Sequence, residues 1–212
     1  MGNVDFKSEE VVAYELGYRA QVTNDLSTDM AIFYNDYDRL RVLVPQDAAP
    51  PFRPIQAQNR MGAKTYGAEW AGTWQARKGW QLYGAYTFLH MALKREQDIS
   101  FTAEAAEHQS PQHQFYLKSS WDLSRNVEFD LIGRYVSRLS GFNLSGTAGI
   151  KNYIRAYGAM DARLAWKPAK NWTLELVGQN LLDRSHPEFG QSNQGPLVEI
   201  ERSVYAKITY EW

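Results

Sequence analysis

Apolar and polar positions alternate with period two along most of the chain. From Val204 to Trp212 every second side chain is apolar, and the positions between them are mostly polar. Successive side chains of a β-strand point to opposite faces, so this stretch predicts a strand with one apolar and one polar face. It ends on an aromatic residue, as the last strand of an outer-membrane barrel does. A terminal strand of a soluble sandwich is the alternative.

The same alternation predicts about nine strands of roughly ten residues, the length that a tilted membrane-spanning strand needs. In the second strand Ile32 and Tyr34 oppose Phe33 and Tyr37, so its faces stay unassigned. The predicted strands are 11–21, 29–44, 65–75, 80–90, 114–121, 127–136, 156–167, 172–181 and 204–212. The fold class is therefore all-β: an antiparallel up-and-down transmembrane barrel segment over residues 1–212, without a plug domain.

Connections between these strands alternate between short and long. The short ones are 23–27, 76–79, 122–126 and 168–171, and the long ones are 45–59, 94–111, 138–152 and 182–197. Four prolines fall in 45–59, and proline lacks the amide donor that a strand ladder needs. Outer-membrane barrels have short turns on one side and long loops on the other, whereas a soluble meander has no reason to sort its connections.

Tryptophan gathers beside the short turns. The residues concerned are Trp74, Trp80, Trp121, Trp166, Trp172 and Trp212. Such a row is typical of the aromatic girdle at one membrane interface. The alternative is that tryptophan caps a soluble core at the ends of its strands.

The polar faces of the predicted strands carry charges of both signs. They are Glu15, Arg19, Glu69, Lys118, Glu128, Asp130, Arg134, Asp161, Arg163, Glu175 and Lys207. These groups cannot face lipid, since Arg or Lys at the bilayer midplane costs about 2–4 kcal/mol. We expect them to line a wet lumen or to contact a plug inside it. Ion pairing between strands within the wall is the alternative.

Composition narrows the functional classes. The chain has 212 residues, 23 basic against 24 acidic ones, and no cysteine. A net charge of -1 gives no electrostatic footprint for nucleic acid. Mean hydropathy is -0.52, and no apolar run approaches the ~18 residues of a spanning helix. The first ten residues lack the apolar core of a signal peptide.

We find no pattern of an enzyme. The four histidines, His90, His108, His113 and His186, lie in or beside long loops without metal-ligand spacing. No carboxylate pair, nucleophile elbow or phosphate-binding glycine motif is recognisable. We therefore expect no catalytic residue, no metal site and no cofactor.

Several stretches, in this order, resemble the C-terminal part of a TonB-dependent outer-membrane receptor. They are residues 7–19, 33–37, 66–70, 110–114 and 178–183, followed by the terminal aromatic. The Gln-Asn-Leu-Leu-Asp run that begins at Gln179 is the most specific. Tyr205, Tyr210 and Trp212 are similar to the signal read by the barrel-assembly machinery. Lys207 departs from that signal, because a small residue usually stands there, and Trp212 replaces the commoner Phe.

The resemblance implies a barrel of about 22 strands around an N-terminal plug in the Gram-negative outer membrane. It also implies TonB-coupled import of a ferric siderophore, cobalamin or a related scarce nutrient. Because plug, TonB box and first strands are not recognisable here, we expect a transporter that is incomplete by itself and reaches TonB only through a plug. A small stand-alone or oligomeric outer-membrane pore and a soluble ligand-binding β-domain are the alternatives.

Cationic and aromatic residues in or near the long loops would suit an anionic iron chelate. They are Arg39, Arg41, Arg53, Arg138, Tyr153 and Arg155. Ordinary solvation of loop side chains is the alternative.

Overall fold

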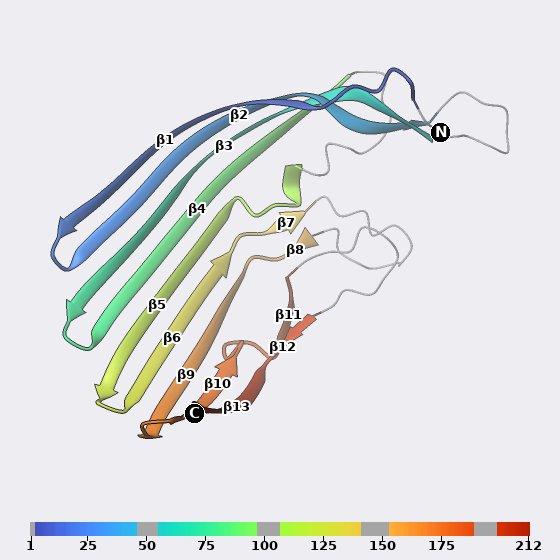
Figure 1. Ribbon diagram of the computed structural model, residues 1–212. Helices are drawn as coiled ribbons and strands as arrows, with labels where there is room; N and C mark the ends of the chain where they lie inside the picture. The colour runs from blue at the N-terminus through green and yellow to red at the C-terminus, as the bar shows by residue number, and fades with distance from the viewer. Residues whose placement is uncertain (1–2, 46–54, 97–106, 141–152, 189–198) are drawn as a thin grey trace.

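The computed structural model describes residues 3–45, 55–96, 107–140, 153–188 and 199–212, and all structural statements below concern these residues. Nine strands form one antiparallel sheet in the order β1-β2-β3-β4-β5-β6-β9-β10-β13 (Figure 1). The strands are β1 (Glu10–Thr23), β2 (Leu26–Pro45), β3 (Ile55–Arg77), β4 (Trp80–Arg95), β5 (His113–Ser124), β6 (Val127–Val136), β9 (Tyr157–Ala169), β10 (Trp172–Gln179) and β13 (Ser203–Tyr210). The predicted all-β antiparallel architecture is confirmed.

The sheet curves into an open trough with β1 and β13 at its two edges (Figure 1). Short turns lie at one end, and the long connections lie at the other. Two small hairpins stand at the long-loop end: β7 (Leu139–Ser140) with β8 (Tyr153–Ile154), and β11 (Ser185–Pro187) with β12 (Glu199–Glu201). Both edge strands run toward the short turns, so they cannot pair with each other in antiparallel fashion.

Several predicted loops contain strand. β2 continues to Pro45 and β3 begins at Ile55, with Val44 opposite Gln56, so the predicted loop 45–59 is wrong at both ends. Pro45 is tolerated because it is the last residue of its strand, where no further ladder bond is needed. β4 likewise continues past His90 to Arg95. Of the small strands, β7 and β11 fall inside the predicted loops 138–152 and 182–197, and β8 and β12 begin just after these loops end.

The register assigns the faces of β2. Tyr34 lies opposite Tyr14 of β1 and Tyr66 of β3, whereas Phe33 lies opposite Glu15 and Gly67. A Cβ on Gly67 would stand 2.6 Å from Cζ of Phe33, so the ring occupies the space that a side chain would need. Phe33 therefore lies on the charged face, where its ring packs over Gly67. Because an aromatic residue stands at a position of the polar face, the alternation of β2 cannot be recognised in the sequence.

The apolar face is largely uncovered. Leu16 is 70% exposed, Leu176 is 52% exposed and Ile208 is 68% exposed. The buried apolar residues of the described chain are few and mostly small or peripheral: Val42, Ala63, Leu139, Ile154, Ala159 and Ala165. An apolar sheet face of this extent calls for a covering medium outside the chain. In the described segments, no helix has the length and apolarity needed to span a membrane.

Candidate functional site

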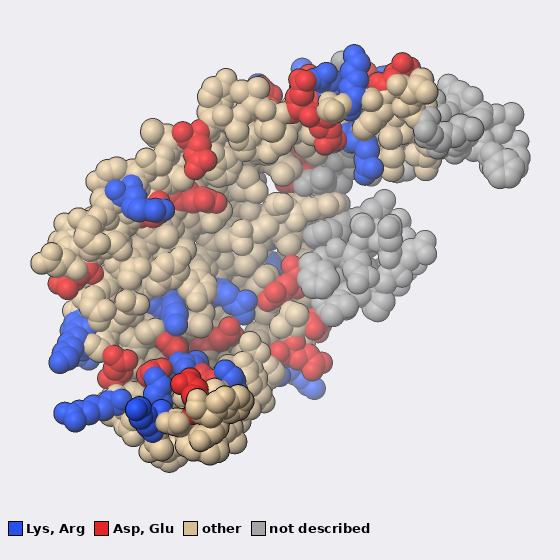
Figure 2. All heavy atoms as spheres, in the orientation of Figure 1, with Lys and Arg blue, Asp and Glu red and all other residues tan. Residues whose placement is uncertain are grey.

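All eleven charged residues singled out in the sequence share one face of the sheet. The register places Glu15 opposite Phe33, Asp130 opposite Arg163, and Glu175 opposite Lys207, and every other member has the same parity. Side chains of Asp130 and Glu175 are only 11% and 12% exposed, far less than the apolar side chains of the other face. Side chains converge on the concave side of a curved sheet and are therefore less exposed there than on the convex side. The low exposure of Asp130 and Glu175 thus identifies the charged face as the inner, concave face of the trough. Acidic and basic side chains are intermixed over its lower part (Figure 2).

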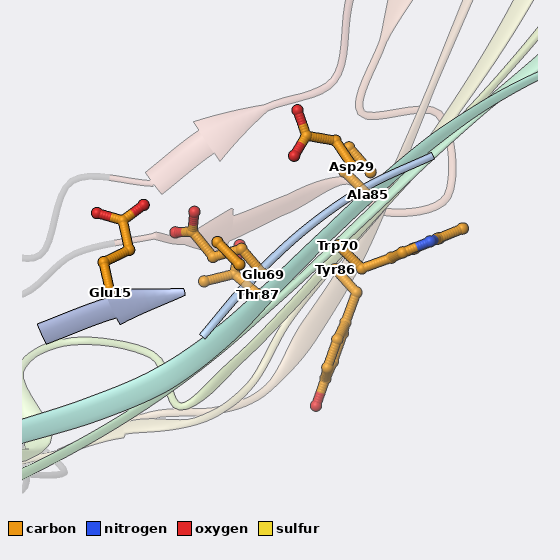
Figure 3. A pocket seen from close by; sticks show the side chains of 9 residues that line it. Glu15, Asp29, Glu69, Trp70, Ala85, Tyr86 and Thr87 are labelled. Atoms are coloured by element: carbon orange, nitrogen blue, oxygen red, sulfur yellow. The ribbon is translucent and has the colours of Figure 1, made fainter. Parts of the chain in front are cut away.

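The inner face of β1 to β4 holds an acidic hollow of about 390 Å³. Glu15, Asp29 and Glu69 line it, and the small Ala31 and Ala85 leave it open. Figure 3 shows the three carboxylates on one side of the sheet, while Trp70 and Tyr86 point to the other side.

Asp29 of this acidic hollow is neutralised, because Arg19 Nε donates to Asp29 Oδ2 at 2.7 Å. Within the described segments, the carboxylates of Glu15 and Glu69 have no ion pair or hydrogen bond. Among the eleven charged residues they alone lack a partner there. The N-terminal half of the inner face therefore carries two unneutralised negative charges.

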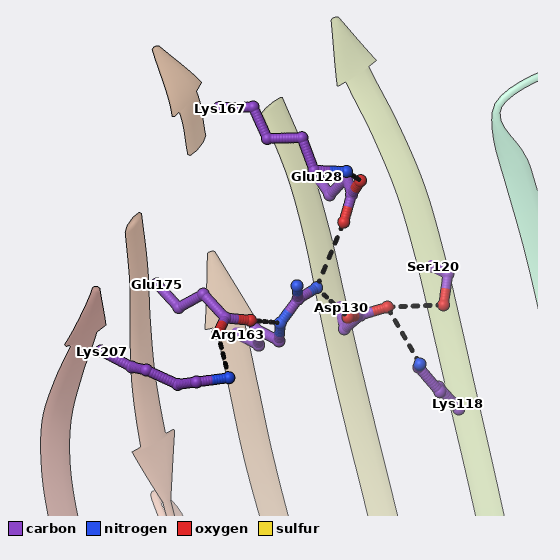
Figure 4. A network of polar contacts seen from close by, with 8 residues as sticks. All are labelled: Lys118, Ser120, Glu128, Asp130, Arg163, Lys167, Glu175 and Lys207. Atoms are coloured by element: carbon purple, nitrogen blue, oxygen red, sulfur yellow. Dashed lines mark hydrogen bonds and ion pairs between the residues drawn. The ribbon is translucent and has the colours of Figure 1, made fainter. Parts of the chain in front are cut away.

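The inner face of the remaining strands is joined by an ion-pair network centred on Arg163 (Figure 4). Its Nη1 lies 2.9 Å from Asp130 Oδ2 and 3.4 Å from Glu128 Oε2, and its Nε donates to Glu175 Oε1 at 2.6 Å. Arg163 can reach all three because its strand lies between theirs, so the groups are direct or diagonal cross-strand neighbours.

Three further cations complete this network, two of them from the strands on either side. Lys118 Nζ lies 3.3 Å from Asp130 Oδ1, and Lys207 Nζ lies 3.1 Å from Glu175 Oε2. Lys167 pairs with Glu128. β5, β6, β9, β10 and β13 are thus linked by four cations and three carboxylates, which is the inter-strand pairing considered from the sequence.

The outer face carries the six tryptophans at its short-turn end. Trp80 stacks on Trp121 with ring centroids 6.3 Å apart, and Trp121 stacks on Phe129 at 5.4 Å. At the other edge Trp172 packs on Tyr210 at 4.9 Å. Trp74 and Trp166 share this face by register, and Trp212 follows β13 with the same parity.

A second aromatic row lies on the outer face at the long-loop end, and the sequence reasoning missed it. Tyr66 packs against His90 at 4.8 Å, Phe88 lies 5.3 Å from His113, and the Tyr86 hydroxyl lies 2.8 Å from His113 Nδ1. Trp80 and Phe88 stand eight positions apart on β4, about 27 Å along a strand. With a tilt of about 40° this gives roughly 20 Å of height, near the ~25 Å apolar band of outer-membrane barrels.

The loop residues suggested as ligand contacts do not form one group. Arg138 and Tyr153 meet, with the guanidinium carbon 4.0 Å from the ring centroid, and Arg155 is exposed just beyond them. Arg39 pairs with Glu10, and the Arg41 backbone amide donates to Glu9 Oε1 at 2.7 Å, both at the opposite part of the sheet. Arg53 lies outside the described residues.

The Gln-Asn-Leu-Leu-Asp run has a structural role that the sequence did not reveal. Asn180 has a φ of 51°, and its side chain is fully buried. Its Nδ2 donates to Ile200 O at 3.0 Å, and its backbone amide donates to Asp161 Oδ1 at 2.9 Å. Asn180 thereby holds the β11–β12 hairpin against the inner face of β9, where His186 packs on Tyr157 at 4.3 Å.

No group of three or more His, Asp or Glu side chains could hold a metal ion within the described ranges.

Comparison with known proteins identifies the family of the chain. The family model described as TonB dependent receptor-like, beta-barrel matches residues 1–181. The chain belongs to this family. Its members are outer-membrane receptors and transporters, which are not enzymes.

The relatives of this TonB-dependent receptor barrel are longer proteins. The catecholate siderophore receptor Fiu of Escherichia coli (strain K12) is 23% identical over 107 residues, which is 50% of this chain and 14% of Fiu. The crystal structure of the ferric-catecholate import receptor Fiu from K12 E. coli in its closed form has a TM-score of 0.76 at 19% identity, covering 97% of this chain and 28% of that chain.

Two other solved structures share the fold to the same extent. The FrpB iron transporter from Neisseria meningitidis gives a TM-score of 0.75 at 15% identity, and the copper transporter OprC gives 0.71 at 14%. Each alignment covers 97% of this chain and 32% of the other. The chain thus spans about a third or less of these proteins, and the likeness shows the fold alone.

Proposed function

We propose that the chain is part of the wall of an outer-membrane receptor that takes up a ferric siderophore or a related scarce nutrient. The observation that carries this proposal is the contrast between the two faces of one sheet. The outer face is apolar with an aromatic row at each end, as lipid requires, and the inner face is charged, as a filled or wet lumen requires. Fiu is a ferric-catecholate import receptor and FrpB is an iron transporter, which favours an iron cargo over the copper of OprC.

Contact with a plug would fall mainly on β1 to β4. Each carboxylate of the Arg163 network is already paired within the wall, so the network needs no cation from a partner. Glu15 and Glu69 are not neutralised, and carboxylates facing a protein-filled lumen would need cationic partners to offset their desolvation. We therefore place the main electrostatic contact with a plug at the acidic hollow, and we expect TonB to act through that plug.

The ligand would be gathered at the long-loop end. Arg138 and Tyr153 offer a cation and an aromatic face side by side, and Arg155 offers a second cation nearby. Such a group suits an anionic chelate with planar rings. Arg39 is already paired with Glu10. We therefore expect Arg39, Arg41 and Arg53 to contribute less to ligand binding than Arg138, Tyr153 and Arg155.

Insertion would use the other end of the chain. Trp74, Trp80, Trp121, Trp166 and Trp172 would lie at the lipid interface together with Trp212. Tyr210 and Trp212 on the outer face and Tyr205 on the inner face would form the signal for the barrel-assembly machinery.

An uptake experiment tests the proposal. The complete receptor that carries this chain is expressed in a Gram-negative strain without its own iron receptors, and uptake of iron-55 on a panel of siderophores is measured. We expect uptake of at least one ferric siderophore, abolished by Arg138→Ala with Tyr153→Ala while the barrel still shows heat-modifiable migration on gels. Uptake of none of the panel would contradict an iron cargo, and cobalamin and copper would then be tested in the same strain.

A further inference from the structure

The short turns at the lower edge of the trough carry unneutralised cations. Arg77 ends β3, Lys78 stands in the β3–β4 turn, Arg125 in the β5–β6 turn and Lys170 in the β9–β10 turn. All four are exposed, and the described residues contain no ion pair that engages any of them. Figure 2 shows basic side chains projecting along this edge. Asp25 in the β1–β2 turn is the one carboxylate of the four turns. We call the four cations the basic rim.

The basic rim continues the tryptophan row of the outer face. The Arg77 guanidinium lies over the Trp80 ring, 5.5 Å from its centroid. Lys170 stands two positions from Trp172, just beyond the aromatic row. In a membrane this is the level at which headgroups replace acyl chains.

Carboxylates near the rim do not cancel it. Asp122, Glu128 and Glu211 have the parity of the inner face. Glu128 is already held by Arg163 and Lys167, and Glu211 meets the β9–β10 turn through its backbone, with no ion pair to Lys170 among the described residues. Asp122 shares a hollow with Lys78 and Arg125, yet no ion pair joins it to either. The positive charge therefore remains available on the side of the turns that borders the lipid.

We infer that the basic rim binds the phosphate groups of anionic phospholipids in the leaflet on the short-turn side. Ammonium and guanidinium groups are strong donors to phosphate oxygens, and long basic side chains reach headgroups while their stems lie along apolar surface. Each cation near an anionic surface favours binding by about fivefold. The inference rests on the membrane placement in the proposed function and adds a lipid preference to it.

Tryptophan fluorescence tests the rim, because the aromatic row lies next to it. The complete receptor is reconstituted in phosphatidylcholine vesicles, and quenching is measured as brominated phosphatidylcholine or brominated phosphatidylglycerol replaces the host lipid. We expect phosphatidylglycerol to bind at least about threefold more strongly than phosphatidylcholine. In Lys78→Gln/Arg125→Gln/Lys170→Gln the ratio should fall to less than about half of the wild-type value, since three of the four rim cations are removed and Arg77 stays on Trp80.

A matched variant removes the same charge at the other end of the strands. Lys64→Gln/Lys94→Gln/Arg155→Gln should keep the wild-type ratio, since these cations stand at the long-loop end. A wild-type ratio near one, as expected if the rim served an acidic protein segment, would overturn the inference, and so would an equal fall in both variants. Absence of quenching by brominated phosphatidylcholine would instead overturn the membrane placement itself.

Discussion

Arg163 contacts three carboxylates from the two strands beside its own, and its side chain is 30% exposed. Ion pairs at this level of exposure contribute little one by one. Removing the shared cation is different, because it leaves Glu128, Asp130 and Glu175 close together and partly desolvated.

We expect Arg163→Ala to lower the free energy of unfolding by about 1–3 kcal/mol, measured by urea unfolding in lipid vesicles. Arg19→Ala is the control, because Asp29 is the one ion-pair partner of Arg19 among the described residues and the Arg19 side chain is 83% exposed. The control should leave the midpoint unchanged. Equal effects of the two substitutions would show that the network contributes no more than an exposed pair.

Gly72 leaves free the space that the ring of Trp70 occupies. A Cβ on Gly72 would lie 2.9 Å from the Trp70 ring, whereas nothing lies within 4 Å of a Cβ on Gly133 of the same face. Gly72→Ala should therefore cost about 1–3 kcal/mol, and most of this cost should vanish in a Trp70→Ala background. Gly133→Ala should be neutral or slightly stabilising. A double-mutant cycle on unfolding free energies measures the coupling, and no coupling would contradict the contact.

At the scale of elements, the β11–β12 hairpin depends on the turn that follows β10. Asn180 combines a positive φ with two hydrogen bonds, one to Ile200 and one to Asp161. Replacement by alanine loses the side-chain bond and strains the backbone, whereas glycine loses only the bond.

Asn180→Ala should increase hydrogen exchange of the β11–β12 amides by a factor equivalent to about 1–3 kcal/mol, and Asn180→Gly should have a smaller effect. Amides in the middle of β10 serve as the internal reference and should be unaffected. A uniform rise across β10 and the hairpin would contradict a local role for Asn180.

Strand positions and faces could be predicted where alternation is strict, as in β6 and β13. The prediction failed where tertiary context decides. Phe33 fills the space over Gly67, so β2 hides its parity, and Pro45 ends a strand rather than opening a loop. The upper aromatic row was present as Tyr66, Phe88 and His113, but its members meet only through the register of β3, β4 and β5.

The same limit applies to the inner face. Parity alone places all eleven charged residues together, because side-chain direction is fixed by position in a strand. Which charges neutralise one another depends on the register between neighbouring strands, which the alternation of apolar and polar residues along the sequence does not reveal. That Glu15 and Glu69 have no partner in the part of the chain that the structure describes therefore became visible only from the fold.

At the scale of the whole molecule, the nine-stranded sheet has two edge strands of equal direction. β1 and β13 both run toward the short turns, so closing an antiparallel barrel needs an odd number of further strands between them. A second copy of the same sheet supplies nine strands, but in the same membrane orientation both of its edge strands also run toward the short turns, so they cannot pair with β1 and β13 in antiparallel fashion.

We expect the 212-residue chain alone, refolded into planar bilayers, to give no steady channels, and to show no heat-modifiable band on gels. The complete receptor, refolded in the same way, is the positive control for the band. Steady openings from the chain alone would contradict this expectation and favour a self-sufficient pore.

The uneven charge of the inner face would also affect the path of a charged solute through an empty lumen. Around the Arg163 network four cations face three carboxylates, so a passing anion meets no net repulsion there. Near Glu15 and Glu69 it is repelled, by about 1 kcal/mol per charge at 4 Å in water and over a range of about 8 Å in physiological salt. A negatively charged solute would therefore drift away from the strands of the acidic hollow and descend along β6, β9 and β10.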